Sequence, residues 1–261
     1  MTQSFSFRRP LLAAVLGAAL LLPGLSGAQT WRQLDAAVAS VGTAEVREEG
    51  LQLNLPLVAE DGSSVPLTIT ADTPAGTRIT RLELFAPANP TPQVATFEFG
   101  EEITRVNLTT RIRLSESQNV IAVAHTSDGK AIVAERAVRV TVSGCVAPAK
   151  SDPASEMKAR VRVPKSWDQA KPAEVLTMIT HPMVTGLAAD ESGNKPATRI
   201  IESFKATLDG KPVLTAHFFR SLAANPYLKF DVAPRQSGKL HLEWVEDTGR
   251  KVEIKEEVRV G

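Results

Sequence analysis

Short apolar stretches that alternate with polar residues constrain the fold of this 261-residue chain most strongly. Every second residue between positions 51 and 57 is leucine, and Val65, Leu67 and Ile69 alternate with proline and threonine. Successive side chains of a strand point to opposite faces, so a period of two predicts half-buried β-strands. Pro56 and Pro66 within these runs predict edge positions or strand ends.

Turn signals divide the chain into many such strands. Asp61-Gly62, Asp128-Gly129, Asp209-Gly210 and Asp247-Thr-Gly249 each separate two apolar runs. Short strands at roughly ten-residue spacing are typical of antiparallel β-sandwiches. The pattern predicts an all-β fold with one sandwich over residues 29–142 and a second over residues 157–261.

One short helix is predicted ahead of the strands, over Thr30–Val41. Thr30 is a suitable N-terminal cap, and Leu34, Val38 and Val41 fall near one face at helical spacing. We expect this helix to pack against the first sheet.

Residues 1–28 have the pattern of a secretory signal peptide. Arg8 and Arg9 precede an apolar run over residues 11–22, and Ser26-Gly27-Ala28 offers small residues for cleavage before Gln29. The two adjacent arginines also fit a twin-arginine signal in part, so either export route remains open. The apolar run is short for a membrane span. The sequence predicts an exported, periplasmic protein.

The charge balance excludes some classes of partner. The chain carries 30 basic and 29 acidic residues, and removal of residues 1–28, which contain two arginines and no acid, leaves a net charge of −1. A near-neutral chain gives no indication of nucleic-acid or anionic-membrane binding. No later stretch is long and apolar enough to span a bilayer.

Cys145 is the only cysteine in the chain, and it lies in a predicted linker over residues 143–156. Its neighbours are small or are proline, which argues against burial. In an exported protein a leftover cysteine indicates an intermolecular disulfide or a reactive thiol, with a buried bystander as the plainer alternative. A Cys145-linked dimer therefore stays open beside a reactive Cys145.

Several residues could tune this thiol. His125 is the nearest histidine in sequence and could activate it, although a surface histidine leading into a turn is the plainer interpretation. Arg136, Arg139 and Lys150 flank the cysteine and would favour a thiolate, but a solvated strand face explains them equally well.

The usual catalytic sets are missing from the sequence. The four histidines, at positions 125, 181, 217 and 241, lack metal-site spacing, and there is no phosphate loop or nucleophile elbow. We therefore predict no catalytic residue, no metal site and no cofactor, and a protein that is not an enzyme. Two stretches stand out as loops, His181–Gly186 ahead of Arg199, and Asn225–Leu228, although two ordinary loops would explain them.

Particular stretches resemble a known family. The second half resembles SoxZ, the non-catalytic partner of the Sox sulfur-oxidation carrier, and the first half resembles SoxY. The matching stretches of the second half are Arg160–Pro164, Ile179–Gly186, Ile200-Ile201 with Phe204, Asn225–Leu228, and Ser237-Gly238 leading to Trp244. Those of the first half are Glu60–Gly62 with Val65-Pro66, Asn89–Pro92, Thr110–Arg113, Ser127–Gly129 and Val140–Cys145.

The resemblance implies two immunoglobulin-like sandwiches in tandem, and the order of the halves resembles fused SoxYZ-like carriers associated with quinoprotein dehydrogenases. In the SoxY family, a glycine-flanked cysteine arm at a free carboxyl terminus carries sulfur intermediates, which Sox enzymes load and process. Cys145 is the position that matches this cysteine. Here Ser143 replaces one glycine, Val146 follows the cysteine, and the chain continues. The alternative is a docking module for a quinoprotein dehydrogenase in which Cys145 is not essential.

Overall fold

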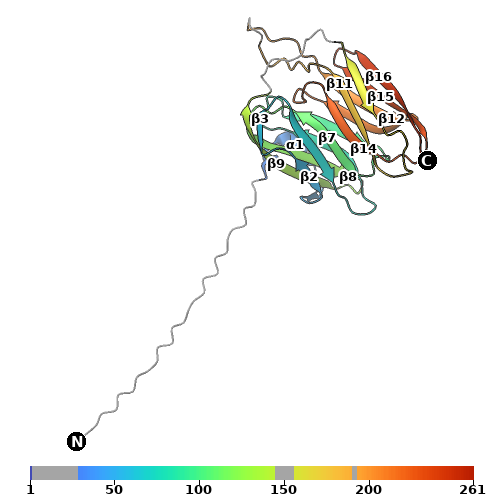
Figure 1. Ribbon diagram of the computed structural model, residues 1–261. Coiled ribbons are helices and arrows are strands. Elements are labelled where there is room, and N and C mark those ends of the chain that lie inside the picture. The colour runs from blue at the N-terminus through green and yellow to red at the C-terminus, as the bar shows by residue number, and fades with distance from the viewer. Residues whose placement is uncertain (2–28, 145–155, 190–192) are drawn as a thin grey trace.

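The computed structural model describes residues 1, 29–144, 156–189 and 193–261 (Figure 1). Residues 2–28 of the predicted signal peptide and residues 145–155 of the predicted linker lie outside the described residues. The elements of the N-terminal half are η1 (Thr30–Gln33), α1 (Asp35–Val41), β1 (Val46–Arg47), β2 (Leu51–Asn54), β3 (Val58–Asp61), β4 (Val65–Ala71), β5 (Ile79–Phe85), β6 (Gln93–Phe99), β7 (Val106–Ile112), β8 (Gln118–Thr126) and β9 (Ala131–Val142).

The C-terminal half consists of strands joined by loops. They are β10 (Lys158–Arg162), β11 (Ala173–Thr180), β12 (Ile201–Leu208), β13 (Lys211–Phe218), β14 (Tyr227–Val232), β15 (Gly238–Glu246) and β16 (Lys251–Val258). Leu240, Leu242 and Trp244 of β15 are buried while the residues between them are not, as the alternation predicts.

Two sheets run through both halves of the molecule. The larger has the order β1-β9-β8-β5-β6-β13-β12-β15-β16, with β3 added beside β9, and the smaller has the order β10-β11-β14-β7-β4-β2. The halves therefore meet edge to edge in both layers, at β6–β13 and at β7–β14 (Figure 1). The two sandwiches are continuous with each other.

The hydrophobic core crosses this junction as well. One cluster of buried side chains extends from Leu51 in β2 to Val258 in β16. Phe97 of β6 and Phe218 of β13 meet edge to face with ring centroids 6.3 Å apart. Such an aromatic pair contributes about 0.5–1.5 kcal/mol beyond its buried area. The junction has the packing of a domain interior.

The predicted fold class is confirmed: the chain is all-β, with two sandwiches in tandem and one short N-terminal α-helix. Most strand pairs are antiparallel, and β1 and β3 run parallel to β9. Pro66 lies in β4 outside the β2–β4 pairing, which ends at Thr68, and Pro56 follows the end of β2. Leu57, however, ends the leucine alternation outside a strand and is exposed.

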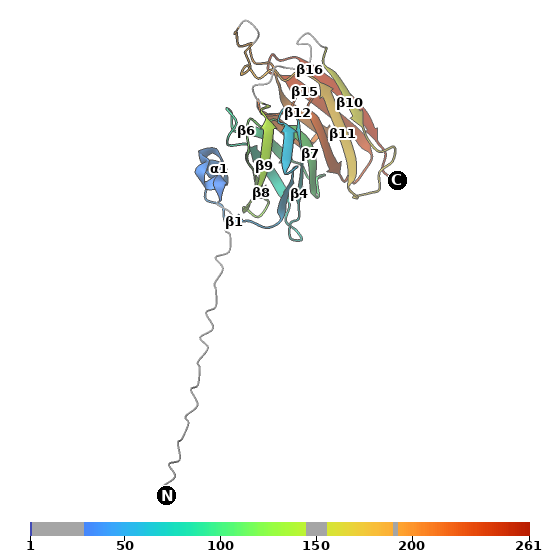
Figure 2. The same ribbon diagram turned by 60° about the vertical axis from the view of Figure 1, so that its left-hand side comes forward.

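The N-terminal helix differs from its prediction. It divides into η1 and α1, and the residue ahead of α1 is Leu34, which makes no side-chain capping bond. Ala37 and Val41 are buried while Val38 is 43% exposed, so the buried face of α1 is not the one that the sequence predicted. Figure 2 shows α1 beside the N-terminal half, on the side away from the C-terminal half, where it covers apolar residues of β5, β8 and β9.

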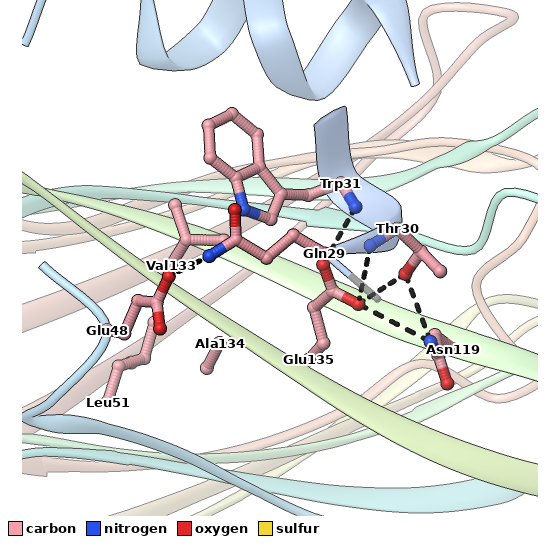
Figure 3. A pocket seen from close by; sticks show the side chains of 9 residues that line it. All are labelled: Gln29, Thr30, Trp31, Glu48, Leu51, Asn119, Val133, Ala134 and Glu135. Atoms are coloured by element: carbon pink, nitrogen blue, oxygen red, sulfur yellow. Dashed lines mark hydrogen bonds between the residues drawn. The ribbon is translucent and has the colours of Figure 1, made fainter. Parts of the chain in front are cut away.

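Glu135 of β9 explains why Thr30 does not cap the helix. Its carboxylate accepts the hydroxyl of Thr30 and the backbone N–H groups of Thr30 and Trp31, at 3.2 and 2.7 Å (Figure 3). These residues line a hollow of about 480 Å³ next to Asn119. These bonds to Glu135 hold the N-terminal segment against β9.

Candidate functional site

Cys145, the predicted site residue, lies outside the described residues. The described chain reaches Gly144, directly ahead of it, and resumes at Glu156. The structure shows how the backbone is held at Gly144, which we call the base of the cysteine segment.

Gly144 is held by a set of backbone hydrogen bonds that we call the glycine clasp, formed by Gly62, Leu114 and Gly144. The N–H of Gly144 donates to the carbonyl of Leu114 at 2.9 Å, and the N–H of Leu114 donates to the carbonyl of Gly62 at 2.8 Å. The N–H of Gly62 donates in turn to Val142 at 2.8 Å. Three segments distant in sequence thus meet one residue before Cys145.

The clasp requires glycine at two positions. A Cβ atom on Gly144 would lie 2.0 Å from the backbone carbon and oxygen of Gly62, and one on Gly62 would lie 2.3 Å from the carbonyl oxygen of Leu114. The obstructing atoms are backbone and cannot rotate away. Glycine is needed here because two backbone segments approach closely. Neither glycine has a positive φ.

The structure separates His125 from the base of the cysteine segment. His125 pairs with Ala131 at the start of β9, whereas Val142 ends that 12-residue strand. At a rise of ~3.3 Å per residue, the two ends of β9 are roughly 35 Å apart. The His125 ring instead lies 3.2 Å from the hydroxyl of Ser40 and 3.7 Å from Glu83. His125 therefore lies far from Gly144, and it is a partly buried residue in contact with α1.

The basic residues proposed to flank the thiol are only partly placed. Arg136 and Arg139 lie on β9 with exposed side chains, and the N–H of Arg139 bonds the carbonyl of Leu57 at 2.9 Å. Lys150 lies outside the described residues. The exposed positions fit a solvated strand face.

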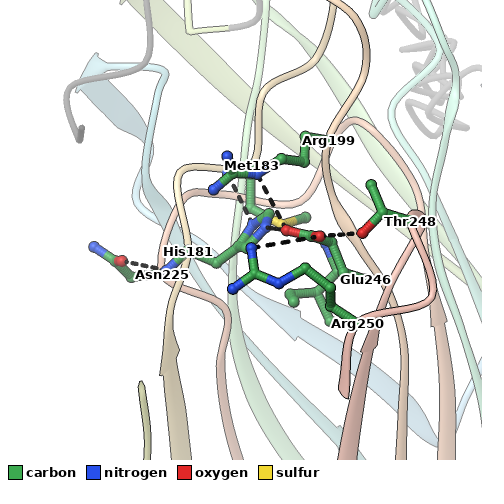
Figure 4. A network of polar contacts seen from close by, with 8 residues as sticks. His181, Met183, Arg199, Asn225, Glu246, Thr248 and Arg250 are labelled. Atoms are coloured by element: carbon green, nitrogen blue, oxygen red, sulfur yellow. Dashed lines mark hydrogen bonds and ion pairs between the residues drawn. The ribbon is translucent and has the colours of Figure 1, made fainter. Parts of the chain in front are cut away.

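The two distinctive loops of the second half form one buried assembly, which we call the His181 network: His181, Met183, Arg199, Asn225 and Glu246. His181 and Glu246 have fully buried side chains, with the His181 Nε2 atom 2.9 Å from a Glu246 oxygen. The Arg199 Nε atom lies 3.1 Å from the same oxygen. Thr248 donates to the other oxygen, so several side chains converge on this carboxylate (Figure 4).

Backbone contacts fix the tautomer of His181. The N–H of Met183 donates to its Nδ1 atom at 3.1 Å, so Nε2 carries the proton and donates to Glu246. The N–H of His181 itself donates to the side-chain oxygen of Asn225 at 3.0 Å. The network ties the loop after β11 to the loop before β14 and to the end of β15.

Burial and charge set the protonation of the pair. Burial lowers the pKa of His181 below its ordinary value, although the Glu246 hydrogen bond opposes this. Burial raises the pKa of Glu246, but hydrogen bonds from Thr248 and His181 and the charge of Arg199 outweigh it, so the net pKa is lowered. The pair therefore consists of a neutral imidazole and a carboxylate.

Two further polar residues connect the network to the glycine clasp. Arg113 follows β7 and is 4% exposed, and its guanidinium donates to the carbonyls of Met183 at 2.9 Å and Pro182 at 3.3 Å. Asn89, also buried, donates to the carbonyl of Arg113 at 2.8 Å and to the hydroxyl of Ser221 at 3.0 Å. The junction of the halves is thus held by polar as well as apolar contacts.

Sequence reasoning missed Glu246 and the roles of Arg113 and Gly62. Glu246 has the same parity along β15 as Leu240, Leu242 and Trp244, and a charged residue at an inward position indicates a buried ion pair. That signal was available. Arg113 follows a strand, and no periodicity distinguishes it.

The structure offers no evident metal site in the part of the chain it describes. Within residues 29–144, 156–189 and 193–261, no three histidine, aspartate or glutamate side chains are grouped for metal binding. In the same residues, every helix is too short or too polar to cross a bilayer.

Comparison with known proteins assigns both halves. Residues 37–145 match the family profile of "Sulfur oxidation protein SoxY", and residues 161–257 match that of "Sulphur oxidation protein SoxZ". The chain belongs to these families as a fused SoxYZ-like protein. The SoxY match ends at Cys145, and the SoxZ match contains the whole His181 network.

Solved structures and curated proteins add the following. The sulfur carrier protein SoxY from Chlorobium limicola f thiosulfatophilum is 31% identical, with 41% of this chain and 94% of that chain covered and a TM-score of 0.36. A superoxide reductase (neelaredoxin) from Ignicoccus hospitalis is 15% identical, with 35% of this chain and 80% of that chain covered and a TM-score of 0.30. A search of curated proteins gives no match.

Proposed function

We propose that this SoxYZ-like protein is a periplasmic sulfur carrier that binds a sulfur species covalently on Cys145 and presents it to partner enzymes. One observation carries the proposal: the SoxY match ends at the only cysteine of the chain, and the residue before that cysteine is anchored in the glycine clasp. An anchored base with a thiol directly beyond it suits presentation of a bound group. The signal-like residues 1–28 support a periplasmic location.

The chemistry of a thiol suits a protein that carries sulfur. A Cys145 thiolate is the nucleophilic form of the side chain. Joining it to a hydrosulfide ion forms a sulfur–sulfur bond, gives a persulfide and releases two electrons, which a partner enzyme must accept. The proposed partners are periplasmic redox enzymes, of Sox type or a quinoprotein dehydrogenase. The fused protein itself then needs no catalytic residue.

Intact mass spectrometry of protein purified from its native periplasm tests this proposal. We expect a mass gain of one or more sulfur atoms, or of a sulfur oxyanion, that disappears on reduction. The matched control is Cys145→Ser, which must lack the gain. A protein whose mass shows no adduct, and whose Cys145 resists alkylation, would contradict carriage. The same measurement shows whether residues 1–28 are removed and whether the chain is cut after Cys145.

A second candidate is a docking module for a periplasmic quinoprotein dehydrogenase. The observation in its favour is that the chain continues past Cys145 into a SoxZ half whose sheets are continuous with those of the SoxY half. Partner binding and dehydrogenase-linked activity that survive Cys145→Ser would support docking over carriage. A Cys145-linked dimer would appear as a doubled mass on a non-reducing gel and would collapse with reductant.

A further inference from the structure

Arg113 lies where the two halves and the glycine clasp meet. It directly follows β7, the SoxY-half strand that pairs with β14 of the SoxZ half. Its guanidinium is buried and donates to the carbonyls of Pro182 and Met183 across the junction. A buried guanidinium needs acceptors, and these two carbonyls of the SoxZ half supply two of them.

Met183 gives this contact a fixed partner. Its N–H donates to His181, its carbonyl accepts from Arg113, and its sulfur accepts the N–H of Ile201 at 3.2 Å. Its φ of 49° is uncommon for a residue with a side chain and persists only where the surroundings hold it. The acceptor for Arg113 is therefore held by the whole His181 network.

The backbone of Arg113 is held across the same junction. Its N–H donates to the carbonyl of Ser221 at 2.7 Å, and its carbonyl accepts from Asn89. The next residue, Leu114, bonds Gly62 with its N–H and Gly144 with its carbonyl. One peptide unit thus separates contacts to the SoxZ half from contacts to the clasp.

We propose that Arg113 is a positioning residue through which the SoxZ half fixes the glycine clasp. On this reading the SoxZ half contributes to how the base of the cysteine segment is held, in addition to any surface it offers to partners. The biological meaning of the inference rests on the proposed carrier function, since the clasp precedes Cys145. Arg113 and the three residues of the clasp all lie in the described part of the chain.

Hydrogen exchange at single amides tests the claim in the full chain. The Gly144 and Leu114 amides each donate within the clasp, so their protection reports its opening. In Arg113→Met we expect the protection of both amides to fall about tenfold or more relative to amides of β4. A merely structural role would lower protection by the same factor in β4 and in the clasp, and that result would overturn the proposal.

Arg105 provides a matched control at the other end of β7. It also bridges the halves, with its guanidinium 3.2 Å from the carboxylate of Asp231, a residue of β14 that is not part of the clasp. Arg105→Met should leave the relative protection of Gly144 at the wild-type value. An equal loss in both variants would mean that any bridge across the junction has this effect, and the role of Arg113 would be lost.

A conservative variant keeps the test usable if Arg113→Met does not fold. Arg113→Lys retains the charge but replaces a planar fork by one point donor, so we expect a smaller loss of Gly144 protection in the same direction. Wild-type protection in a folded Arg113→Lys together with loss in Arg113→Met would show that charge alone suffices. No loss in either folded variant would overturn the proposal.

A spin label on Cys145 separates this inference from the proposed function. Because the chain has one cysteine, a nitroxide reagent labels one position. We expect the spectrum of Arg113→Met to shift toward the sharp lines of a mobile label, with Arg105→Met unchanged. A shifted spectrum together with no sulfur adduct in the native protein would support the positioning role and contradict the carrier function. An unchanged spectrum together with a sulfur adduct would contradict the positioning role and support the carrier function.

Discussion

Each half of the molecule holds one histidine–glutamate pair in or near its interior, and these two pairs differ in burial, whereas a third pair, His241 and Glu253, is more exposed. In the SoxY half, the His125 and Glu83 side chains are 24% and 11% exposed, and Ser40 of α1 donates to Glu83 at 2.8 Å. In the SoxZ half, the side chains of His181 and Glu246 are both fully buried. The first pair fastens a surface helix to a sheet, whereas the second is part of the interior.

The difference shows that the environment, more than the residue types, decides what such a pair contributes. The His125 ring, 3.7 Å away, has the largest influence and lowers the pKa of Glu83, burial opposes it, and Ser40 and Arg81 add to the lowering. For Glu246 burial is the largest influence and acts against ionisation, so its donors must outweigh a larger penalty. Removal of a partner should therefore be more damaging in the SoxZ half.

The largest expected effect follows from Glu246→Gln. This change keeps the shape of the side chain but removes the charge that pairs with Arg199, and it leaves one acceptor oxygen where Thr248 and His181 now have two. We expect the free energy of unfolding to fall by about 3 kcal/mol, as for other broken buried ion pairs. Urea unfolding followed by tryptophan fluorescence measures it. A loss no larger than that of Glu83→Gln would remove the contrast between the two pairs.

The second prediction concerns pH. The pKa of His181 is lowered from 6.5, so the unfolded chain takes up the proton first as the pH falls. Its contribution to stability is complete above pH 6.5 and is lost as the pH falls below that value. We expect a slope of up to about 1.4 kcal/mol per pH unit in this window.

Unfolding curves measured between about pH 7 and pH 5 check this slope, because that pH range spans the ordinary histidine pKa. His181→Gln should flatten it, and His241→Gln, at a partly exposed histidine of β15, should retain the wild-type slope. A flat profile in the wild-type protein would mean that His181 takes up its proton at the same pH in the folded and unfolded states. The contrast with the partly exposed pair of His125 and Glu83 would then have another origin.

The sequence allowed the strands and the fold class to be predicted, but not the way in which the halves join. The alternation of apolar residues at Val65, Leu67 and Ile69 reveals a buried face, because it reflects only which side of the strand faces solvent. The pairing of β6 with β13 depends on which strand edge meets which, and side-chain periodicity carries no information about that. The shared core therefore became visible only in the structure.

The site residues divide in the same way. His181, Arg199 and Asn225 were singled out in the sequence as parts of separate loops. In the structure Glu246 joins His181 to Arg199, and Asn225 bonds the backbone of His181. Gly62 and Gly144 looked like ordinary turn and linker glycines. Their importance arises from the approach of two backbones more than 80 residues apart in sequence, which local patterns cannot reveal.

A smaller effect is expected for Glu83→Gln. The carboxylate accepts from Ser40 and lies 3.1 Å from the Arg81 guanidinium, which is about half exposed. Solvent weakens such pairs, so we expect a loss of about 1 kcal/mol or less in unfolding free energy. Hydrogen exchange should show faster opening of α1 with little change in β12 and β15. Equal loss of protection in the SoxZ half would mean that α1 is coupled to the whole sandwich.

The last comparison concerns the hydroxyl donor of each pair, where the expected difference between the two variants is about 1 kcal/mol. Ser40 donates to Glu83 and Thr248 donates to Glu246, so each carboxylate has one hydroxyl that can be removed. We expect Ser40→Ala to cost about 0.5 kcal/mol and Thr248→Val about 1.5 kcal/mol, because a buried carboxylate that loses a donor cannot replace it with water. Urea midpoints measure both losses. Similar losses would mean that water reaches Glu246 once Thr248 is changed, and the burial of that pair would then depend on a single hydroxyl at the end of β15.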